Sequence, residues 1–165
     1  MKTKIYSVFP ACGKTWLYKH QDDYGIKILD SDSSRFSWDY TCVDQNGNPI
    51  GCVRKVRNPN FPQNYIDHIK ENIGKVDYIF VSSHDLVRNA LDIEGIDFTI
   101  VYPEHRCKEE WIGRCFVREM QGEDGCRAEV MYDNFDDWVM DCFKTGINHD
   151  EIVLKAQEYL SDYFK

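Results

Sequence analysis

Apolar runs alternate with amphipathic stretches along the first two thirds of this chain. The apolar, β-prone runs are Ile5–Phe9, Gly25–Leu29, Tyr78–Val81 and Phe98–Tyr102. Short continuous apolar runs are typical of parallel strands that are buried on both faces. The helical periods between them are Lys14–His20, Gln63–Ile73, Asp85–Glu94 and Glu104–Met120. This alternation predicts an α/β/α fold of three layers, with helices on both faces of a parallel sheet.

The order of the strands follows from the handedness of the connections. Right-handed crossovers favour the order 2-3-1-4, in which the first strand is central. Ala128–Tyr132 is the one candidate for a fifth strand. Beyond it we expect a C-terminal helical extension over 134–145 and 149–164, because Asn148 and Glu151 have the spacing of a capping box. Residues 1–165 are therefore expected to form one domain with a sheet of four or five strands.

Composition narrows the classes of protein to consider. The 165 residues are 42% hydrophobic and carry a net charge of −8, which favours a packed core and disfavours duplex DNA or an anionic membrane as the main partner. Seven cysteines without a C-x-x-C pair indicate free thiols. No apolar segment has the length of a signal region or a membrane span, so we expect a soluble, cytoplasmic protein.

A phosphate-binding motif follows the first apolar run. Gly13, Lys14 and Thr15 have the spacing of the last three residues in G-x-x-x-x-G-K-[ST], and Val8 stands where that motif has its first glycine. In such a loop the backbone N–H groups surround phosphates, the Lys reaches the β and γ oxygens and the Thr binds Mg²⁺. The candidate contacts for ATP or another NTP are Pro10, Ala11, Cys12, Gly13, Lys14, Thr15 and Trp16. Modification of Cys12 is expected to block binding.

Carboxylates follow the second apolar run. Asp30 and Asp32 are two residues apart, so they lie on one face if the chain is still extended there. Phosphoryl transfer needs a carboxylate near Mg²⁺ and often a second one that orients the acceptor. We expect Asp30 to hold the metal, together with Thr15, and Asp32 to orient the acceptor. The alternative is that both aspartates only cap turns.

The third apolar run ends in serines and a histidine rather than in a carboxylate. Ser82 or Ser83 is expected to cap the helix that follows, and Asp85 suits its N-terminus. His84 is a candidate substrate contact, with a purely structural role as the alternative.

Basic residues complete the candidate site. Arg114 and Arg118 are four residues apart on a predicted helix, so both can reach one anion from a lid-like element at about 104–125. The alternative is a solvated helix whose arginines pair with neighbouring glutamates. An irregular stretch at about 33–62 is rich in turn signals and is the predicted acceptor-binding loop. Its candidate substrate contacts are Arg35, Arg54 and Arg57.

These motifs resemble those of P-loop kinases of small molecules. Pro10–Thr15 resembles the P-G-x-G-K-[ST] loop of adenylate kinases, with Ala11 at a glycine position. Leu29–Asp32 resembles the D-x-D of shikimate kinases, and Val81–Arg88 is similar to a segment of gluconate kinases. Arg114 and Arg118 resemble their lid arginines. The arrangement is also similar to uncharacterised bacteriophage proteins described as nucleotide-kinase-like, which implies the host cytoplasm as location.

The resemblance implies an ATP- and Mg²⁺-dependent phosphotransferase acting on a nucleotide or nucleoside-like acceptor. Lys14, Asp30, Asp32, Arg114 and Arg118 are its expected catalytic residues. Two alternatives stay open: a kinase of nucleic-acid ends or modified bases, and a non-catalytic nucleotide-binding or anti-defence protein. The residues at Val8 and Ala11, where the motif has glycine, are the main support for the second alternative.

Overall fold

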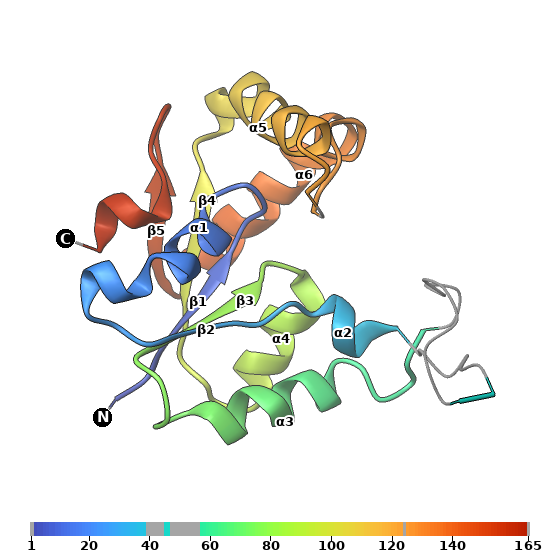
Figure 1. Ribbon diagram of the computed structural model, residues 1–165, viewed down its shortest axis with the longest axis vertical. Helices are drawn as coiled ribbons and strands as arrows, with labels where there is room; N and C mark the ends of the chain where they lie inside the picture. Colours follow the sequence, from blue (N-terminus) through green and yellow to red (C-terminus); the bar gives the residue numbers. More distant parts are fainter. Residues whose placement is uncertain (1, 39–44, 47–56, 124, 165) are drawn as a thin grey trace.

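A five-stranded, fully parallel sheet forms the centre of the computed structural model, which describes residues 2–38, 45–46, 57–123 and 125–164 (Figure 1). The strands, in the spatial order β2-β3-β1-β4-β5, are parallel to their neighbours throughout. Their bounds are β1 Lys4–Val8, β2 Ile28–Asp30, β3 Tyr78–Ser82, β4 Thr99–Pro103 and β5 Asp150–Leu154. The predicted order of the first four strands is confirmed, and the motif-bearing strand β1 is central.

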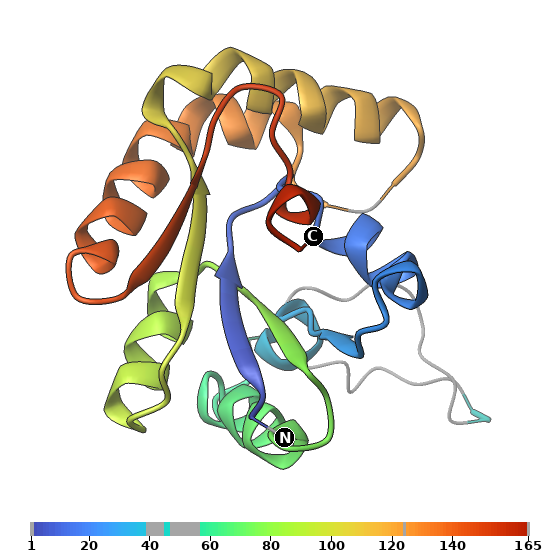
Figure 2. The same ribbon diagram turned by 90° about the vertical axis from the view of Figure 1, so that its left-hand side faces the viewer.

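Helices cover both faces of the sheet. They are α1 Lys14–Lys19, α2 Ser34–Ser37, α3 Gln63–Asn72, α4 Asp85–Ile93, α5 Lys108–Met120 and α6 Ala128–Gly146, with 3-10 turns η1 Gln21–Tyr24, η2 His105–Cys107 and η3 Leu160–Tyr163. Figure 2 shows α4 and α6 on one face and α1 with η3 on the other. The helix α5 follows the carboxyl end of β4 and packs on α6. The expected three-layer architecture is therefore present.

One continuous apolar core joins the layers. Buried residues of the strands pack against α3, α4, α5 and α6, and Trp111 and Tyr65 are among its largest fully buried side chains. Gln63–Ile73 is a helix as expected up to Asn72: Ile66 and Ile69 are fully buried, whereas Ile73 lies beyond the helix and is 44% exposed.

The predicted C-terminal helical extension is wrong in its second half. Residues 150–154 form the parallel edge strand β5, which pairs with β4 over five residues. The exposed edge of β4 offers backbone hydrogen bonds that a local capping pattern cannot outweigh, and Tyr102 donates a hydrogen bond to Glu151 across the pair. Ala128–Tyr132 is not a strand, because it forms the first turns of α6.

The apolar residues of α6 differ in their burial. Phe135 and Val139 are buried, but Phe143 is 52% exposed, and Cys142 takes the inward position. Among the described residues, no helix has the length and apolar character needed to cross a membrane.

Candidate functional site

The phosphate loop connects β1 to α1 at the carboxyl edge of the sheet. The N–H of Phe9 still donates to the carbonyl of Val101 on β4, and the loop then turns through Pro10–Gly13. Ala11 has φ 61° and Gly13 has φ 90°, so two residues of the loop have left-handed backbone. Ala11 occupies a conformation that glycine adopts at less cost, which accounts physically for the glycine of the motif at this position.

Three successive backbone donors of this loop are available to a ligand. Within the described part of the chain, the N–H groups of Ala11, Cys12 and Gly13 have no hydrogen-bond partner. Successive N–H groups in a loop of mixed right- and left-handed backbone form an anion-binding concavity. The loop therefore has the donor arrangement that a phosphate group requires.

Lys14, Thr15 and Asp30 meet where β1 and β2 end. The Lys14 Nζ lies 2.8 Å from Asp30 Oδ1, and the Thr15 hydroxyl donates to Asp30 Oδ2 at 3.3 Å. All three come from the predicted set, and they contact each other although Asp30 is on a separate strand. Thr15 is exposed, so its hydroxyl is accessible to a bound ligand.

The second aspartate is held as a carboxylate. Burial alone would raise the pKa of Asp32, but hydrogen bonds from Ser34 and the charges of Lys14 and Arg35 bring that pKa below its ordinary value. The backbone N–H of Ser34 donates to Asp32 Oδ1 at 2.9 Å. Between the two aspartates, the carbonyl of Ser31 accepts a hydrogen bond of 2.8 Å from the buried hydroxyl of Tyr65. The core thus fixes the peptide that carries both carboxylates.

The candidate acceptor contacts lie near Asp32. Desolvation of the ring lowers the pKa of His84, and the charges of Asp85, Arg88, Arg57 and Asp32 act on it as well, in that order of size. The guanidinium of Arg57 stacks on the ring of Trp38 at 3.9 Å. Arg54 lies outside the described residues. The exposed side chain of Arg35 is on α2.

A cavity adjoins the phosphate loop on the side of α4 and α6. Its volume is about 430 Å³. It is lined by Pro10 of the loop, by Ser83, His84 and Asp85 at the start of α4, and by Trp138, Asp141 and Lys144 of α6. This volume is in the range of sites for small molecules.

The two arginines of α5 are placed differently. The side chain of Arg114 is only 9% exposed and donates to the carbonyls of Ala11 and Glu158. Arg118 lies one turn farther along and forms an ion pair of 3.4 Å with Glu123. Of the pair that was expected to reach one anion, Arg114 is the residue in contact with the phosphate loop.

Two candidate nucleotide contacts, Cys12 and Trp16, differ in their access to solvent. Cys12 is 1% exposed, and burial raises the pKa of its thiol to about 12, so it is a protonated core residue. The thiol does not reach solvent in this structure, and the effect of its modification on binding stays a prediction. Trp16 is 50% exposed and stacks on His20 at 4.0 Å.

The oxygen atoms of Thr15 and Asp30 suit Mg²⁺ that is bound together with phosphates, rather than a metal held by protein side chains alone. The described residues contain no group of three or more His, Cys, Asp or Glu side chains able to hold a metal ion. Mg²⁺ is usually bound through one or two carboxylates plus the phosphates and waters. The oxygens of Thr15 and Asp30 are such a small, hard donor set.

Sequence reasoning missed Trp111 and the segment 155–160. The indole Nε1 of Trp111 donates to the carbonyl of Pro10, and the N–H of Leu160 donates to that of Cys12. Trp111 is three residues before Arg114, so the helical spacing places both on one face of α5. That spacing was the available signal, whereas the contact of 155–160 depends on β5, which was taken for a helix.

Comparisons with known proteins give one distant structural similarity. Neither a protein family model nor a curated protein matches the chain. Among solved structures, the chain is similar to a gluconokinase from Sinorhizobium meliloti 1021, with 12% sequence identity and a TM-score of 0.46. The match covers 98% of this chain and 86% of that one. This similarity is too low to indicate a function, so any functional conclusion depends on the side chains described above.

Proposed function

We propose that this chain is a nucleoside triphosphate-dependent phosphotransferase that acts on a small acceptor of the nucleotide or nucleoside class. The observation that carries the proposal is the meeting of Lys14, Thr15 and Asp30 beside three unpaired backbone N–H groups. Cationic, hydroxyl and amide donors then converge on one spot, which is the environment that a triphosphate needs.

Each group at this spot has a distinct role in the proposal. The N–H groups of Ala11, Cys12 and Gly13 bind phosphate oxygens, and Lys14 exchanges Asp30 for the β and γ oxygens. Thr15 and Asp30 would hold Mg²⁺, which supplies neutralisation of the phosphate charge when bound. Arg118 is the arginine proposed for the transferred group, because Arg114 is committed to the phosphate loop.

The acceptor is proposed to bind between Asp32, Arg57 and His84, with the cavity beside Pro10 as part of its site. The lowered pKa of Asp32 keeps it ionised at neutral pH. An ionised carboxylate of low basicity suits orientation of an acceptor hydroxyl, and phosphoryl transfer through a loose transition state asks little of a base. Arg35 and Arg54 are proposed as further acceptor contacts.

A non-catalytic nucleotide-binding protein is the second candidate. It is favoured by the end of β3, because Ser82 stands there, whereas catalytic P-loop proteins often have a metal-binding carboxylate at this point. This candidate requires the same phosphate loop but no acceptor chemistry, so one set of assays separates the two.

The first experiment measures binding of Mg²⁺·ATP by calorimetry to the wild-type protein, Lys14→Ala and Lys19→Ala. We expect Lys14→Ala to bind about 100-fold more weakly, because it loses charge-assisted hydrogen bonds of roughly 1.5–3 kcal/mol each. Lys19 lies in the last turn of the same helix α1 and is the matched control. Equal binding by Lys14→Ala and the wild type would rule out this loop as the phosphate site.

The second measurement follows ADP formation in the presence of nucleosides and nucleoside monophosphates. Acceptor-dependent ADP supports the phosphotransferase. Binding of ATP without any acceptor-dependent ADP supports the non-catalytic protein instead.

A further inference from the structure

Three successive carbonyls of the phosphate loop accept hydrogen bonds from outside the loop. The carbonyl of Pro10 accepts from Trp111 Nε1 at 3.0 Å, and that of Ala11 accepts from Arg114 Nη1 at 3.1 Å. The carbonyl of Cys12 accepts from the backbone N–H of Leu160 at 2.9 Å. Two of the donors come from α5 and one comes from the segment after β5, so elements far apart in sequence meet on this loop.

These contacts determine where the loop donors point. In a trans peptide the C=O of one residue and the N–H of the next are antiparallel. Carbonyls held outward at positions 10, 11 and 12 therefore direct the N–H groups of Ala11, Cys12 and Gly13 to the opposite side. Those are the three N–H groups without a partner in the described residues.

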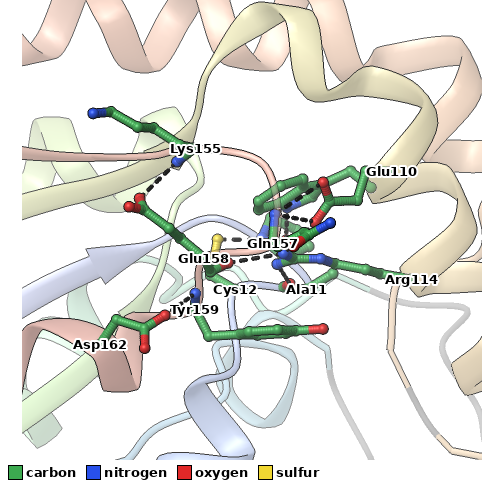
Figure 3. Close-up of polar contacts among 11 residues, drawn as sticks. Ala11, Cys12, Glu110, Arg114, Lys155, Gln157, Glu158, Tyr159 and Asp162 are labelled. Atoms are coloured by element: carbon green, nitrogen blue, oxygen red, sulfur yellow. Dashed lines mark hydrogen bonds and ion pairs between the residues drawn. The ribbon is translucent and has the colours of Figure 1, made fainter.

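The guanidinium of Arg114 is held by two aromatic rings and by hydrogen bonds from Nη1 and Nη2. It lies between the rings of Trp111 and Tyr159, at 3.7 and 4.0 Å from the two ring centroids. Its Nη2 donates to Glu110 at 2.5 Å and to the carbonyl of Glu158 at 2.8 Å (Figure 3). Planar stacking together with a fixed fork of donors leaves the side chain little freedom.

Neighbouring contacts lock the C-terminal segment to α5 as well. The carboxylate of Glu110 accepts hydrogen bonds of 3.0 and 3.1 Å from the N–H of Gln157 (Figure 3). The ring of Tyr159 lies so close to Gly13 that a Cβ there would be 3.1 Å from Tyr159 Cδ1. The loop is thus enclosed by side chains on its outer surface.

We propose that Trp111, Arg114 and Leu160 form a carbonyl clamp that preorganises the phosphate loop, with Arg114 as a positioning residue rather than a ligand of the transferred phosphoryl group. This inference rests on the proposed function, since the clamp directs the N–H groups of the loop at a bound phosphate. It takes over the shaping role that the missing loop glycines have in the motif, because external donors hold Ala11 in its left-handed conformation.

The test compares Arg114→Met and Trp111→Phe with Arg127→Met. Arg127, the residue before α6, forms an exposed ion pair with Glu119 of α5 and, within the described residues, has no hydrogen bond or ion pair with the phosphate loop, so it is the matched control. The first measurement is the set of NMR amide order parameters of residues 11–13 without ligand. The second is calorimetric binding of Mg²⁺·tripolyphosphate, a probe that has phosphates but no base.

We expect the order parameters to fall from about 0.85 in the wild type to below about 0.6 in Arg114→Met, with a smaller fall in Trp111→Phe. Binding of tripolyphosphate should weaken by about 10- to 100-fold in Arg114→Met and about 5-fold in Trp111→Phe. A purely structural role would lower the thermal stability and leave both measurements on the folded protein unchanged.

The outcomes separate the clamp from the proposed function. Order parameters in Arg114→Met and Trp111→Phe that match those of Arg127→Met would overturn the clamp, whatever the ligand binding. If the wild type does not bind tripolyphosphate, the proposed function fails. A fall in the order parameters would then still support the clamp as the element that shapes this loop.

Discussion

Every carbonyl of the proposed phosphate loop from Pro10 to Gly13 accepts a hydrogen bond from another element or from α1, whereas the proposed acceptor contacts Asp32, Arg57 and His84 are held differently. Asp32 is bound by the adjacent Ser34, and Arg57 stacks on an aromatic ring. The phosphate wall, which we define as residues 10–13, is fixed before a ligand arrives. The acceptor wall, which consists of Asp32, Arg57 and His84, has local or stacking contacts that an acceptor can rearrange.

The difference has a physical meaning for transfer. Donors that are already aimed at the phosphates add no reorganisation cost when the reaction begins. An acceptor wall that adjusts on binding lets part of the acceptor's binding energy complete the site. We therefore expect changes in the phosphate wall to act on nucleotide binding and changes in the acceptor wall to act on acceptor kinetics.

The largest expected contrast is between Asp30→Asn and Asp32→Asn. Asp30 contacts Lys14 and Thr15, so its change should weaken Mg²⁺·ATP binding and lower transfer by about 100-fold or more. Asp32→Asn should leave the affinity for Mg²⁺·ATP unchanged and reduce kcat/KM for the acceptor by about 10- to 100-fold. Separate titrations of nucleotide and acceptor measure this.

The two amides are matched controls for each other, because each substitution removes one charge from the same edge of the sheet. If Asp32→Asn weakened nucleotide binding as much as Asp30→Asn, the two walls would not be separable.

A smaller contrast lies within the phosphate wall. Gly13→Ala should destabilise the fold by about 1–3 kcal/mol and weaken nucleotide binding, because Gly13 has φ 90° and its added Cβ meets Tyr159. Ala11→Gly should change stability by between zero and about 1 kcal/mol in the stabilising direction, since glycine relieves the strain at φ 61° but gains entropy in the unfolded chain. Thermal unfolding measures both, and equal losses in the two variants would contradict a glycine-specific requirement at position 13.

Sequence patterns predicted the sheet well because buried parallel strands are continuous apolar runs and right-handed crossovers restrict their order. The edge strand β5 was missed since two of its five residues are acidic and exposed, and only the free edge of β4 identifies it. The parallel sheet accounts for Lys14 and Asp30 lying at the same edge, whereas the direct ion pair between them was not predicted.

The arginines of α5 mark where sequence reasoning stops. Arg114 and Arg118 are four residues apart on one helix, and this spacing predicts a shared role. Their contacts differ, because Arg114 faces Trp111, Tyr159 and the carbonyl of Ala11, while Arg118 on the next turn pairs with Glu123. Tyr159 and Glu158 contact Arg114 from the segment after β5, and a contact so distant in sequence leaves no periodic pattern around Arg114.

The smallest expected effect is at Cys12, and it measures how closed the phosphate wall is. The thiol is 1% exposed, and its pKa of about 12 keeps it protonated at neutral pH, so iodoacetamide should not modify it in the folded protein. Cys126 is the internal control. It is half-buried, and a hydrogen bond from Cys115 lowers the pKa of its thiol, so it should react first.

Mass spectrometry of peptides after timed labelling, with and without denaturant, distinguishes the two cysteines. In denaturant both should react at similar rates, because only the fold protects Cys12. Labelling of Cys12 in the folded protein at the rate of Cys126 would mean that the loop opens readily. A fast opening of this kind would remove the contrast between a fixed phosphate wall and an adjustable acceptor wall, since the carbonyls of Pro10 to Cys12 could not then be held together in the absence of ligand.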